Sequence, residues 1–240
     1  MQLLPSEDRG RAKFGWLDSR HSFSFGSYHN PEYMGFGALR VINEDRVKPG
    51  AGFETHAHQD MEIISYILEG GLEHKDSIGT GSVIKPGDVQ RMTAGTGIRH
   101  SEFNASKTDP VHFLQIWVVP DTKGLTPGYE QKSFPLVRRE NTLLLIGSRD
   151  GRDGSITIHQ DVDLYTSLLM KGQAVSFTIK PKRMLWIQIV SGYLDIGGNF
   201  YGEGDGLGIH EEEGPLTLKS IHDKSSEFLL FDLSSEFATS

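Results

Sequence analysis

The chain has 240 residues, enough for one large or two modest domains, and a formal net charge of −8. It contains no cysteine, which excludes disulfides, thiolate zinc sites and cysteine nucleophiles, so any metal must be held by nitrogen and oxygen. There is no dense cluster of Lys and Arg. Direct binding to nucleic acid is therefore not expected, because affinity for phosphate backbones depends on clustered positive charge.

The apolar runs of the chain are short. The longest cover residues 61–68 and 111–120, far below the length that crosses a bilayer. The N-terminus lacks the basic and then apolar pattern of a signal peptide. We therefore expect a cytoplasmic protein that does not bind membranes.

Short β-type runs separated by turn signals follow one another along the chain, which also contains 28 glycines. This pattern favours an all-β fold over a helical one, and the regular spacing suggests sandwich or barrel sheets. The predicted strands cover residues 36–43, 61–68, 81–84, 111–119, 142–146, 164–170, 184–190 and 227–233.

A segment near the middle of the chain is typical of a linker. Residues 120–139 contain three prolines and two glycines among charged residues. We therefore predict a first domain over residues 1–120, a linker over 121–139 and a second domain over 140–240.

Two pairs of candidate metal ligands each have a spacing of two residues. His56 and His58 form the first pair, and His100 and Glu102 form the second. Side chains at positions i and i+2 of a strand point to the same face. If the two strands lie side by side in a barrel, three imidazoles and one carboxylate converge, a ligand set that suits a divalent transition metal. One isolated His-x-His pair would fit the solvent face of a strand about as well as it fits a metal site. The second pair, His-x-Glu, favours a metal site.

The two halves of the chain resemble each other. Residues 64–70 and residues 186–192 both read as a strand that ends in a glycine turn, and a Gly-Asp turn follows each of them. With Gly192 placed opposite Gly70, residues Thr178, Lys180 and Met184 stand opposite His56, His58 and Glu62. We infer a duplication in which one half is chemically active and the other, without metal ligands, is structural.

The chain resembles the pirins, which are bicupins of the cupin superfamily. Residues 50–70, with His56-x-His58 and then Glu62, are similar to the first cupin motif. Residues 95–104 are similar to the second, with Gly95 in place of the usual proline. The segments 15–19, 34–36 and 92–102 are similar to those of pirins. The resemblance covers essentially the whole chain and implies two cupin-type jelly-roll β-barrels in tandem.

The resemblance also implies which carboxylate binds the metal, a question that spacing leaves open. In many cupins the glutamate matching Glu62 is a ligand, whereas pirins bind iron through residues that correspond here to His56, His58, His100 and Glu102. Glu62 is then a residue that orients a ligand or is simply paired near the site. Four protein ligands would saturate tetrahedral zinc but leave two positions on six-coordinate Fe(II), so Fe(II) is the expected cofactor and other divalent transition metals stay open.

Some pirins are similar in activity to quercetin 2,3-dioxygenases. The resemblance thus implies cleavage of a flavonol such as quercetin with O2, with Glu102 as the catalytic residue, both metal ligand and proton acceptor. The alternative comes from animal pirins, described as metal-dependent transcriptional co-regulators: a redox-sensing binding module that acts through protein partners. A cavity at the metal that admits a bicyclic aromatic substrate would favour the enzyme, and an iron-dependent exposed patch the sensor. If the metal only stabilised the fold, we would expect a closed coordination sphere and no open cavity.

Several other residues attract attention but have simpler explanations. We expect hydrogen-bonded packing roles for the histidines that lack a partner motif, which are His21, His29, His74, His112 and His159. Met34, Phe36, Phe53 and Ile98 are candidates for an apolar pocket over the metal or for ordinary core. Arg99 is expected to point away from the face that carries His100.

Overall fold

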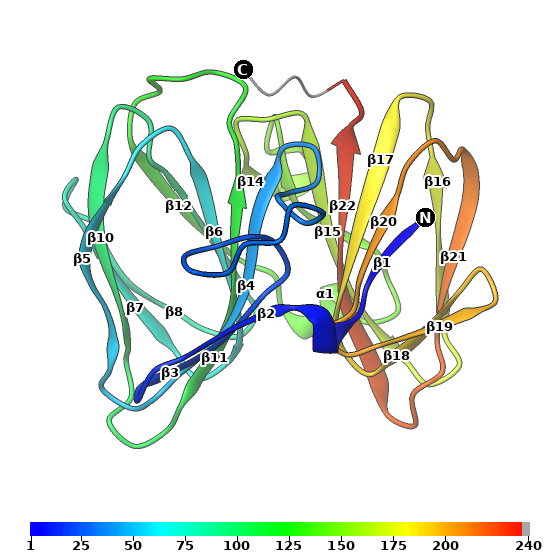
Figure 1. The fold of residues 1–240 in the computed structure, drawn as a ribbon, viewed down its shortest axis with the longest axis horizontal. Coiled ribbons are helices and arrows are strands. Elements are labelled where there is room, and N and C mark those ends of the chain that lie inside the picture. Colours follow the sequence, from blue (N-terminus) through cyan, green and yellow to red (C-terminus); the bar gives the residue numbers. More distant parts are fainter. Residues whose placement is uncertain (237–240) are drawn as a thin grey trace. The chain divides into compact units, whose positions relative to one another are not determined.

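The computed structural model describes residues 1–236, which form an almost purely β structure (Figure 1). The all-β prediction is confirmed. The chain divides into two compact units. The first unit contains residues 10–134 and 156–160, and the second contains residues 1–9, 135–155 and the chain from residue 161 onward. Among the described residues, no helix has the length and the apolar character needed to cross a membrane.

The first unit consists of two antiparallel sheets. In order across the sheet, the larger contains β12 (Gly128–Ser133), β9 (Asp88–Thr93), β6 (Glu62–Glu69), β11 (Val111–Val118), β4 (Leu39–Val47), β3 (Leu17–His21) and β2 (Gly10–Lys13). The smaller contains β5 (Gly52–His58), β10 (Ile98–Asn104), β7 (Leu72–Asp76) and β8 (Gly81–Ile84). The two-residue strand β14 (Ile156–Thr157) also belongs to this unit.

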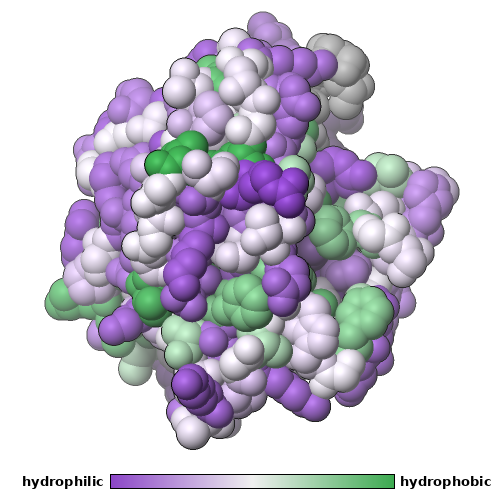
Figure 2. Space-filling view, turned by 90° about the vertical axis from the view of Figure 1, so that its left-hand side faces the viewer, coloured by the Kyte–Doolittle hydropathy of each residue, from purple (hydrophilic) through white to green (hydrophobic). Residues whose placement is uncertain are grey.

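Burial along these strands explains their sequences. The central strand β6 is buried over its first six residues, which include three isoleucines, as expected for a strand covered on both faces. In β10, buried and less buried residues alternate, and Arg99 is exposed as predicted. Figure 2 shows the outer face of this unit, on which hydrophobic residues are scattered among hydrophilic ones.

The second unit repeats this arrangement. Its larger sheet contains β1 (Gln2–Leu4), β20 (Gly206–Ile209), β17 (Arg183–Ser191), β22 (Ser225–Ser234), β15 (Val162–Met170) and β13 (Leu144–Ser148). Its smaller sheet contains β16 (Ala174–Ile179), β21 (Gly214–Ser220), β18 (Tyr193–Ile196) and β19 (Asn199–Gly202). Up to residue 236, the helical segments of this unit are one short α-helix, α1 (Leu136–Arg139), and the 3-10 turns η1 (Ser6–Asp8) and η2 (Arg152–Gly154).

The strand orders of the two units correspond one for one. The order β9-β6-β11-β4 in the first unit matches β20-β17-β22-β15 in the second, and β5-β10-β7-β8 matches β16-β21-β18-β19. The strand that carries His56 thus corresponds to the strand that carries Thr178, as the inferred duplication requires. The topology supports that duplication.

The units differ from the predicted domain bounds at three places. The predicted linker contains β12, which pairs with β9 along its whole length, and α1. Residues 1–9 belong to the second unit, where β1 pairs with β20. Residues 156–160 belong to the first, where the Arg91 guanidinium donates to the Thr157 carbonyl over 2.8 Å. Pairing with a distant strand leaves no local signal in composition, so the sequence did not reveal these exchanges.

One row of residues across the larger sheet of the first unit is polar. Directly opposite one another on neighbouring strands, and all buried, are His21, Asn43, Gln115, Ser65 and Gln90, which we call the polar row. Residues directly opposite across a sheet share one face. The corresponding row in the second unit consists of Tyr165, Leu230, Ile187 and Leu207. The fold therefore does not itself require polar residues in this row.

The turn between β9 and β10 requires glycine at position 95. Gly95 has a φ of +46°, and a Cβ on it would lie 1.9 Å from the carbonyl oxygen of Leu125. We expect Gly95→Ala to lower the melting temperature at least twice as much as Gly124→Ala, which has a positive φ but nothing within 4 Å of its Cβ position. The backbone cost of about 1 kcal/mol alone corresponds to a loss of about 2–4 °C in a chain of this size. Equal losses in thermal unfolding would contradict the steric argument.

Candidate metal centre

Strands β5 and β10 bring the predicted ligands together. They pair antiparallel, with His100 opposite His56 and Ile98 opposite His58. The register then shifts, so that Glu102 stands opposite Phe53. Two residues of β5, Glu54 and Thr55, thus stand opposite one residue of β10, Ser101, which is a β-bulge. Because of the extra residue, Phe53 and His56 both line the same cavity, although regular alternation would place them on opposite faces.

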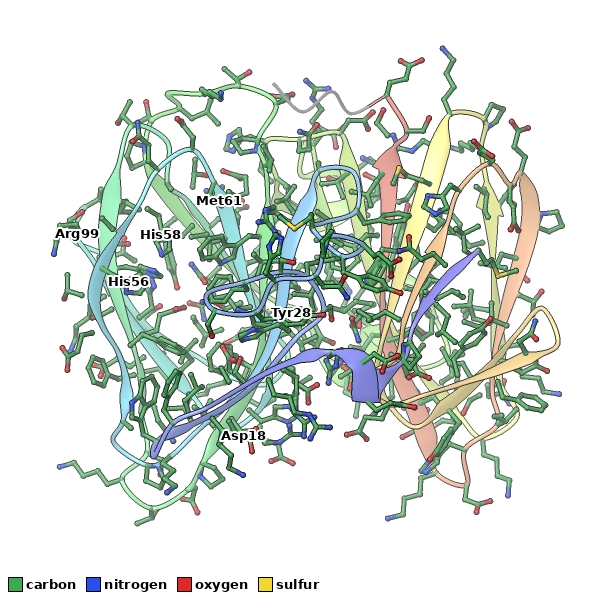
Figure 3. All side chains as sticks on the ribbon, viewed as in Figure 1. Asp18, Tyr28, His56, His58, Met61 and Arg99 are labelled. Atoms are coloured by element: carbon green, nitrogen blue, oxygen red, sulfur yellow. The ribbon has the colours of Figure 1, made fainter. Side chains whose placement is uncertain are left out.

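The three histidines converge on one position. The Nε2 atoms of His56 and His100 lie 3.1 Å apart. The ring centroid of His58 lies 4.7 Å from that of His56 and 4.8 Å from that of His100. One nitrogen from each ring lies within 4.8 Å of the others, a spacing that fits one metal ion. In Figure 3 the side chains of His56 and His58 point inward from the ribbon and Arg99 points outward.

His56 and His58 each have a ring nitrogen that is available to a metal. The Nδ1–H of His56 donates to the carbonyl oxygen of Glu54 over 2.7 Å, which leaves the Nε2 lone pair free. The Nε2 of His58 is buried and has no hydrogen-bond partner within residues 1–236. A buried unpaired nitrogen is costly unless a ligand satisfies it. These atoms therefore fit a divalent metal.

A buried pair behind His100 orients its ring in the same way. Asp76 Oδ2 accepts a hydrogen bond from Nε2 of His74 over 3.0 Å, and neither side chain is exposed. The Nδ1 of His74 then accepts from Nδ1–H of His100, at 3.5 Å. This tautomer directs the Nε2 lone pair of His100 toward His56. A carboxylate that acts through a second group to fix a metal ligand is common in metal sites.

Burial also keeps two of these imidazoles neutral. The pKa of His58 falls to about 4, first because of burial and then because of the neighbouring His100 and His56. The pKa of His100 falls to about 3, first because of burial and then because of His56 and His74. Since metal ligands must be deprotonated, both rings are ready to bind a cation at neutral pH.

Glu102 lies beside His100 but is held by the polar row. Its Oε2 accepts a hydrogen bond from Nε2 of Gln115 over 2.6 Å, and its Oε1 accepts from the Ser65 hydroxyl over 3.3 Å. The carboxylate groups with His74 and His100, whereas His56, His58 and His100 form the other possible metal-binding group. The two groups share His100. The structure therefore brings the three predicted histidines together and places Glu102 next to them, against Gln115.

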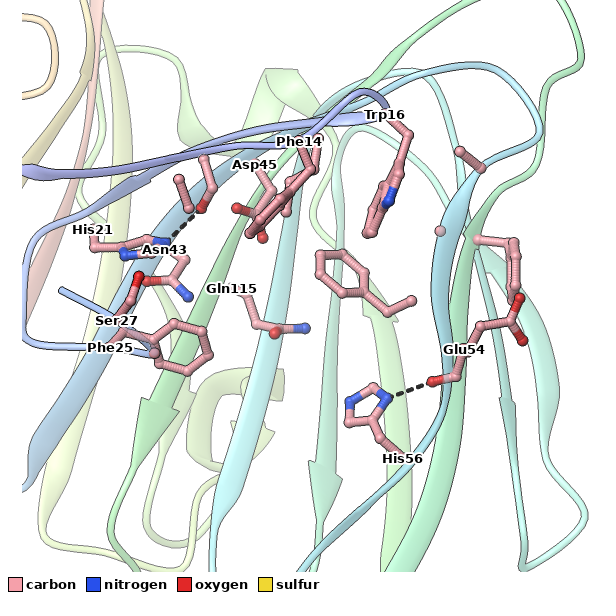
Figure 4. Close-up of a pocket in the computed structure, with 18 of the residues that line it drawn as sticks. Phe14, Trp16, His21, Phe25, Ser27, Asn43, Asp45, Glu54, His56 and Gln115 are labelled. Carbon is pink, nitrogen blue, oxygen red and sulfur yellow. Dashed lines mark hydrogen bonds between the residues drawn. The ribbon is translucent and has the colours of Figure 1, made fainter.

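A cavity of about 780 Å³ opens onto His56 and His58 (Figure 4). Its wall includes six aromatic side chains, which are Phe14, Trp16, Phe25, Phe53, Phe103 and Trp117. The Trp117 ring meets His58 edge to face, with 5.0 Å between the ring centroids. Of the four residues predicted as an apolar pocket, Phe53 lines this cavity, whereas Ile98 packs in a core cluster with Met92 and Ile63.

Glu62 pairs away from the three histidines. Its Oε2 accepts hydrogen bonds from the backbone N–H of His159 over 3.2 Å and from the His159 ring over 3.0 Å. The Arg91 Nε lies 3.7 Å from the same oxygen. Glu62 thus attaches residues 156–160 to the first unit, and it belongs to neither possible metal-binding group among the described residues.

The remaining histidines partly match the expectation of packing roles. His112 bonds Glu44 over 2.9 Å, and the Nε2 of His21 bonds the Ser19 hydroxyl over 2.8 Å. His29 is exposed, contrary to the prediction. The contact of His74 with His100 was missed, although His74 and Asp76 have the same i, i+2 spacing as the recognised pairs. Only the pairing of β7 with β10 reveals that contact.

Comparisons with known proteins match both halves of the chain to known families. Residues 5–118 match the family described as Pirin, and residues 145–233 match the Quercetinase C-terminal cupin domain. A protein of Escherichia coli strain K12 named quercetin 2,3-dioxygenase is 48% identical over 96% of this chain and 97% of its own length.

Solved structures show the same fold. The crystal structure of YhhW from Escherichia coli has a TM-score of 0.93 and 45% identity, and covers 99% of each chain. YhhW, described as a bacterial pirin, is also solved in complex with nickel(II), with a TM-score of 0.91 and 46% identity over 97% of this chain and 98% of that one. The predicted tandem cupin fold is confirmed, and the chain belongs to the pirin family.

Proposed function

We propose that this protein is a metal-dependent dioxygenase that cleaves flavonols such as quercetin with O2. The observation that carries the proposal is the cavity of about 780 Å³, with aromatic walls, that opens onto His56 and His58. Its volume lies within the range of sites that enclose small molecules. The relative named quercetin 2,3-dioxygenase, which is similar along nearly its whole length, supports the same substrate class.

We assign the metal to His56, His58, His100 and Glu102, with Fe(II) as the native ion. The lone pairs that converge from His56 and His100, and the unpaired Nε2 of His58, support the histidine ligands. The nickel complex of the related YhhW supports binding of a divalent transition metal. When bound, the metal would supply Lewis-acid chemistry at the substrate oxygens.

The protein's own groups account for proton transfer and positioning. The neutral donors Gln115 and Ser65 hold the Glu102 carboxylate without neutralising its charge, so it stays able to accept the proton of the flavonol 3-hydroxyl. The aromatic wall holds the flat substrate and excludes water from it. Trp117 restrains the His58 ring, which keeps the ligand set in one geometry.

The cavity also favours the enzyme over the two alternatives. A redox-sensing co-regulator that acts through protein partners needs the same ligands but no space for a bicyclic aromatic molecule at the metal. A purely structural centre predicts a closed site. The open cavity beside His56 and His58 supports a site that admits a substrate.

Metal-free protein reloaded anaerobically with Fe(II) is expected to consume O2 when quercetin is added, because the cavity gives the flavonol access to the metal. The double variant His56→Ala/His58→Ala should lose both bound metal and oxygen uptake. His112→Ala is the matched control, since its ring bonds Glu44 and lies outside the cluster. Oxygen uptake is measured with an oxygen electrode and bound metal by metal analysis, for the Fe(II)-loaded and the Ni(II)-loaded protein. Absence of uptake in fully loaded wild-type protein would contradict the proposal.

Glu102→Gln is expected to lower kcat by about 100-fold or more, since a positioned base contributes about 10²- to 10⁴-fold and an amide accepts no proton. Ser65→Ala removes only the longer of the two hydrogen bonds to this carboxylate and should have a smaller effect. Steady-state kinetics and metal content are measured together. Full turnover with normal metal content in Glu102→Gln would exclude the base role.

A further inference from the structure

Two buried oxygen atoms in the wall of the cavity lack hydrogen-bond partners. Asn43 and Asp45 line the same cavity as His56 and His58, and each is only 3% exposed. Within the part of the chain that the structure describes, neither the Oδ1 of Asn43 nor the Oδ1 of Asp45 has a hydrogen-bond partner. Buried polar groups of this kind are costly unless a ligand or water satisfies them. Their position in a cavity points to a ligand.

The fold does not explain these polar residues. Asn43 and Asp45 are two residues apart on β4, on the face that also carries Val41 and Val47. Asn43 belongs to the polar row, and the residue in the corresponding row of the second unit is Tyr165. The second unit forms the same strand order with a largely apolar row. Asp45, opposite Phe113, corresponds to the buried Ser167, opposite Phe228, so the second unit has neither the amide nor the carboxyl group at these positions. The amide–carboxyl pair is therefore a feature of the first unit's cavity.

The surroundings of Asp45 preserve one oxygen for a ligand. The Ser19 hydroxyl forms a hydrogen bond with the Asp45 carboxyl, and burial raises the pKa of that carboxyl to about 7, with smaller contributions from Glu102 and Glu44. In Figure 4, Gln115 lies between these two residues and His56. The polar pair thus lies apart from the histidines in the same cavity.

The unpaired atoms determine the chemistry of the ligand. The Asn43 Oδ1 is an acceptor, and so is the Asp45 Oδ1 when it carries no proton, so the ligand must present donors. The aromatic side chains that line the same cavity suit a flat ring system. We propose that Asn43 and Asp45 form a second polar subsite that binds ring hydroxyl groups of the substrate, at the end of the molecule away from the metal-binding histidines. The proposal rests on the proposed function and narrows the substrates from flavonols in general to flavonols that carry hydroxyl groups on an outer ring.

The test compares the binding of two flavonols under anaerobic conditions, where no turnover occurs. Quercetin carries hydroxyl groups on both outer rings, whereas 3-hydroxyflavone carries only the hydroxyl near the metal. Trp16 and Trp117 line the cavity, so quenching of tryptophan fluorescence reports binding to metal-loaded protein. We expect quercetin to bind about 10- to 100-fold more tightly, the range for satisfying two buried acceptors that otherwise lack a partner. If burial of aromatic surface alone determined the affinity, the more apolar 3-hydroxyflavone would bind more tightly than quercetin.

Variants of Asn43 and Asp45 test whether these residues cause the preference for quercetin. Asp45→Leu and Asn43→Leu are each expected to reduce the preference for quercetin toward unity, and Asp45→Asn, which keeps an acceptor oxygen, should retain part of it. The matched control is Glu44→Gln, which alters a neighbouring buried carboxyl on β4 that does not line the cavity. It should keep the full preference. Thermal unfolding verifies that each variant folds. If Asp45→Leu does not fold, the proposal is tested by Asn43→Leu and by the two affinities of the wild-type protein.

Equal affinities of the two flavonols for wild-type protein would overturn the subsite. A preference that survives both leucine variants would overturn it as well. These outcomes are distinct from failure of the proposed function. If quercetin-dependent oxygen uptake occurs while the affinities are equal, only the subsite is wrong. If the preference depends on Asn43 and Asp45 but no uptake occurs, the subsite stands and the dioxygenase reaction is wrong.

Discussion

The pairing of β5 with β10 is the constraint on which the candidate site depends. It sets His100 opposite His56 and, through the bulge after this pair, turns Phe53 and both β5 histidines toward one cavity. A slip of one residue would turn a whole strand over, because the side-chain period of a strand is two. The smaller sheet therefore supplies the three imidazoles, and the larger sheet supplies the cavity's polar wall.

The polar row shows how function is added to a duplicated fold. In the second unit, Ile187, Leu207 and Leu230 occupy this row and belong to its apolar core. In the first unit, Ser65 and Gln115 replace such residues and donate to Glu102. Neutral donors stabilise a buried carboxylate without forming an ion pair, so no protein cation neutralises the negative charge that a metal ion would meet. The apolar version of the row supports the same strand order, which indicates that the polar version serves the site.

The sequence predicted the parts that rest on local spacing. The i, i+2 pairs predicted the three histidines that converge, and the glycine turns with short apolar runs predicted the all-β fold. Contacts made through distant pairing were not visible. Strand β12 lies where composition predicted a linker, and residues 156–160 leave their neighbours to join the first unit. His74 reaches His100 only because β7 pairs with β10, and no local pattern encodes that proximity.

The burial that shapes the cavity also prepares the histidines to bind a metal. Removal from water lowers the pKa of His58 and His100, so protons compete little with a cation at neutral pH. The same burial makes unprotonated lone pairs unfavourable until something satisfies them. The Asp76–His74 pair fixes one ring from behind, and a backbone carbonyl of β5 fixes another. Since each ring is already oriented before a metal binds, little conformational entropy is lost on binding, and the strain of facing lone pairs is relieved by the cation.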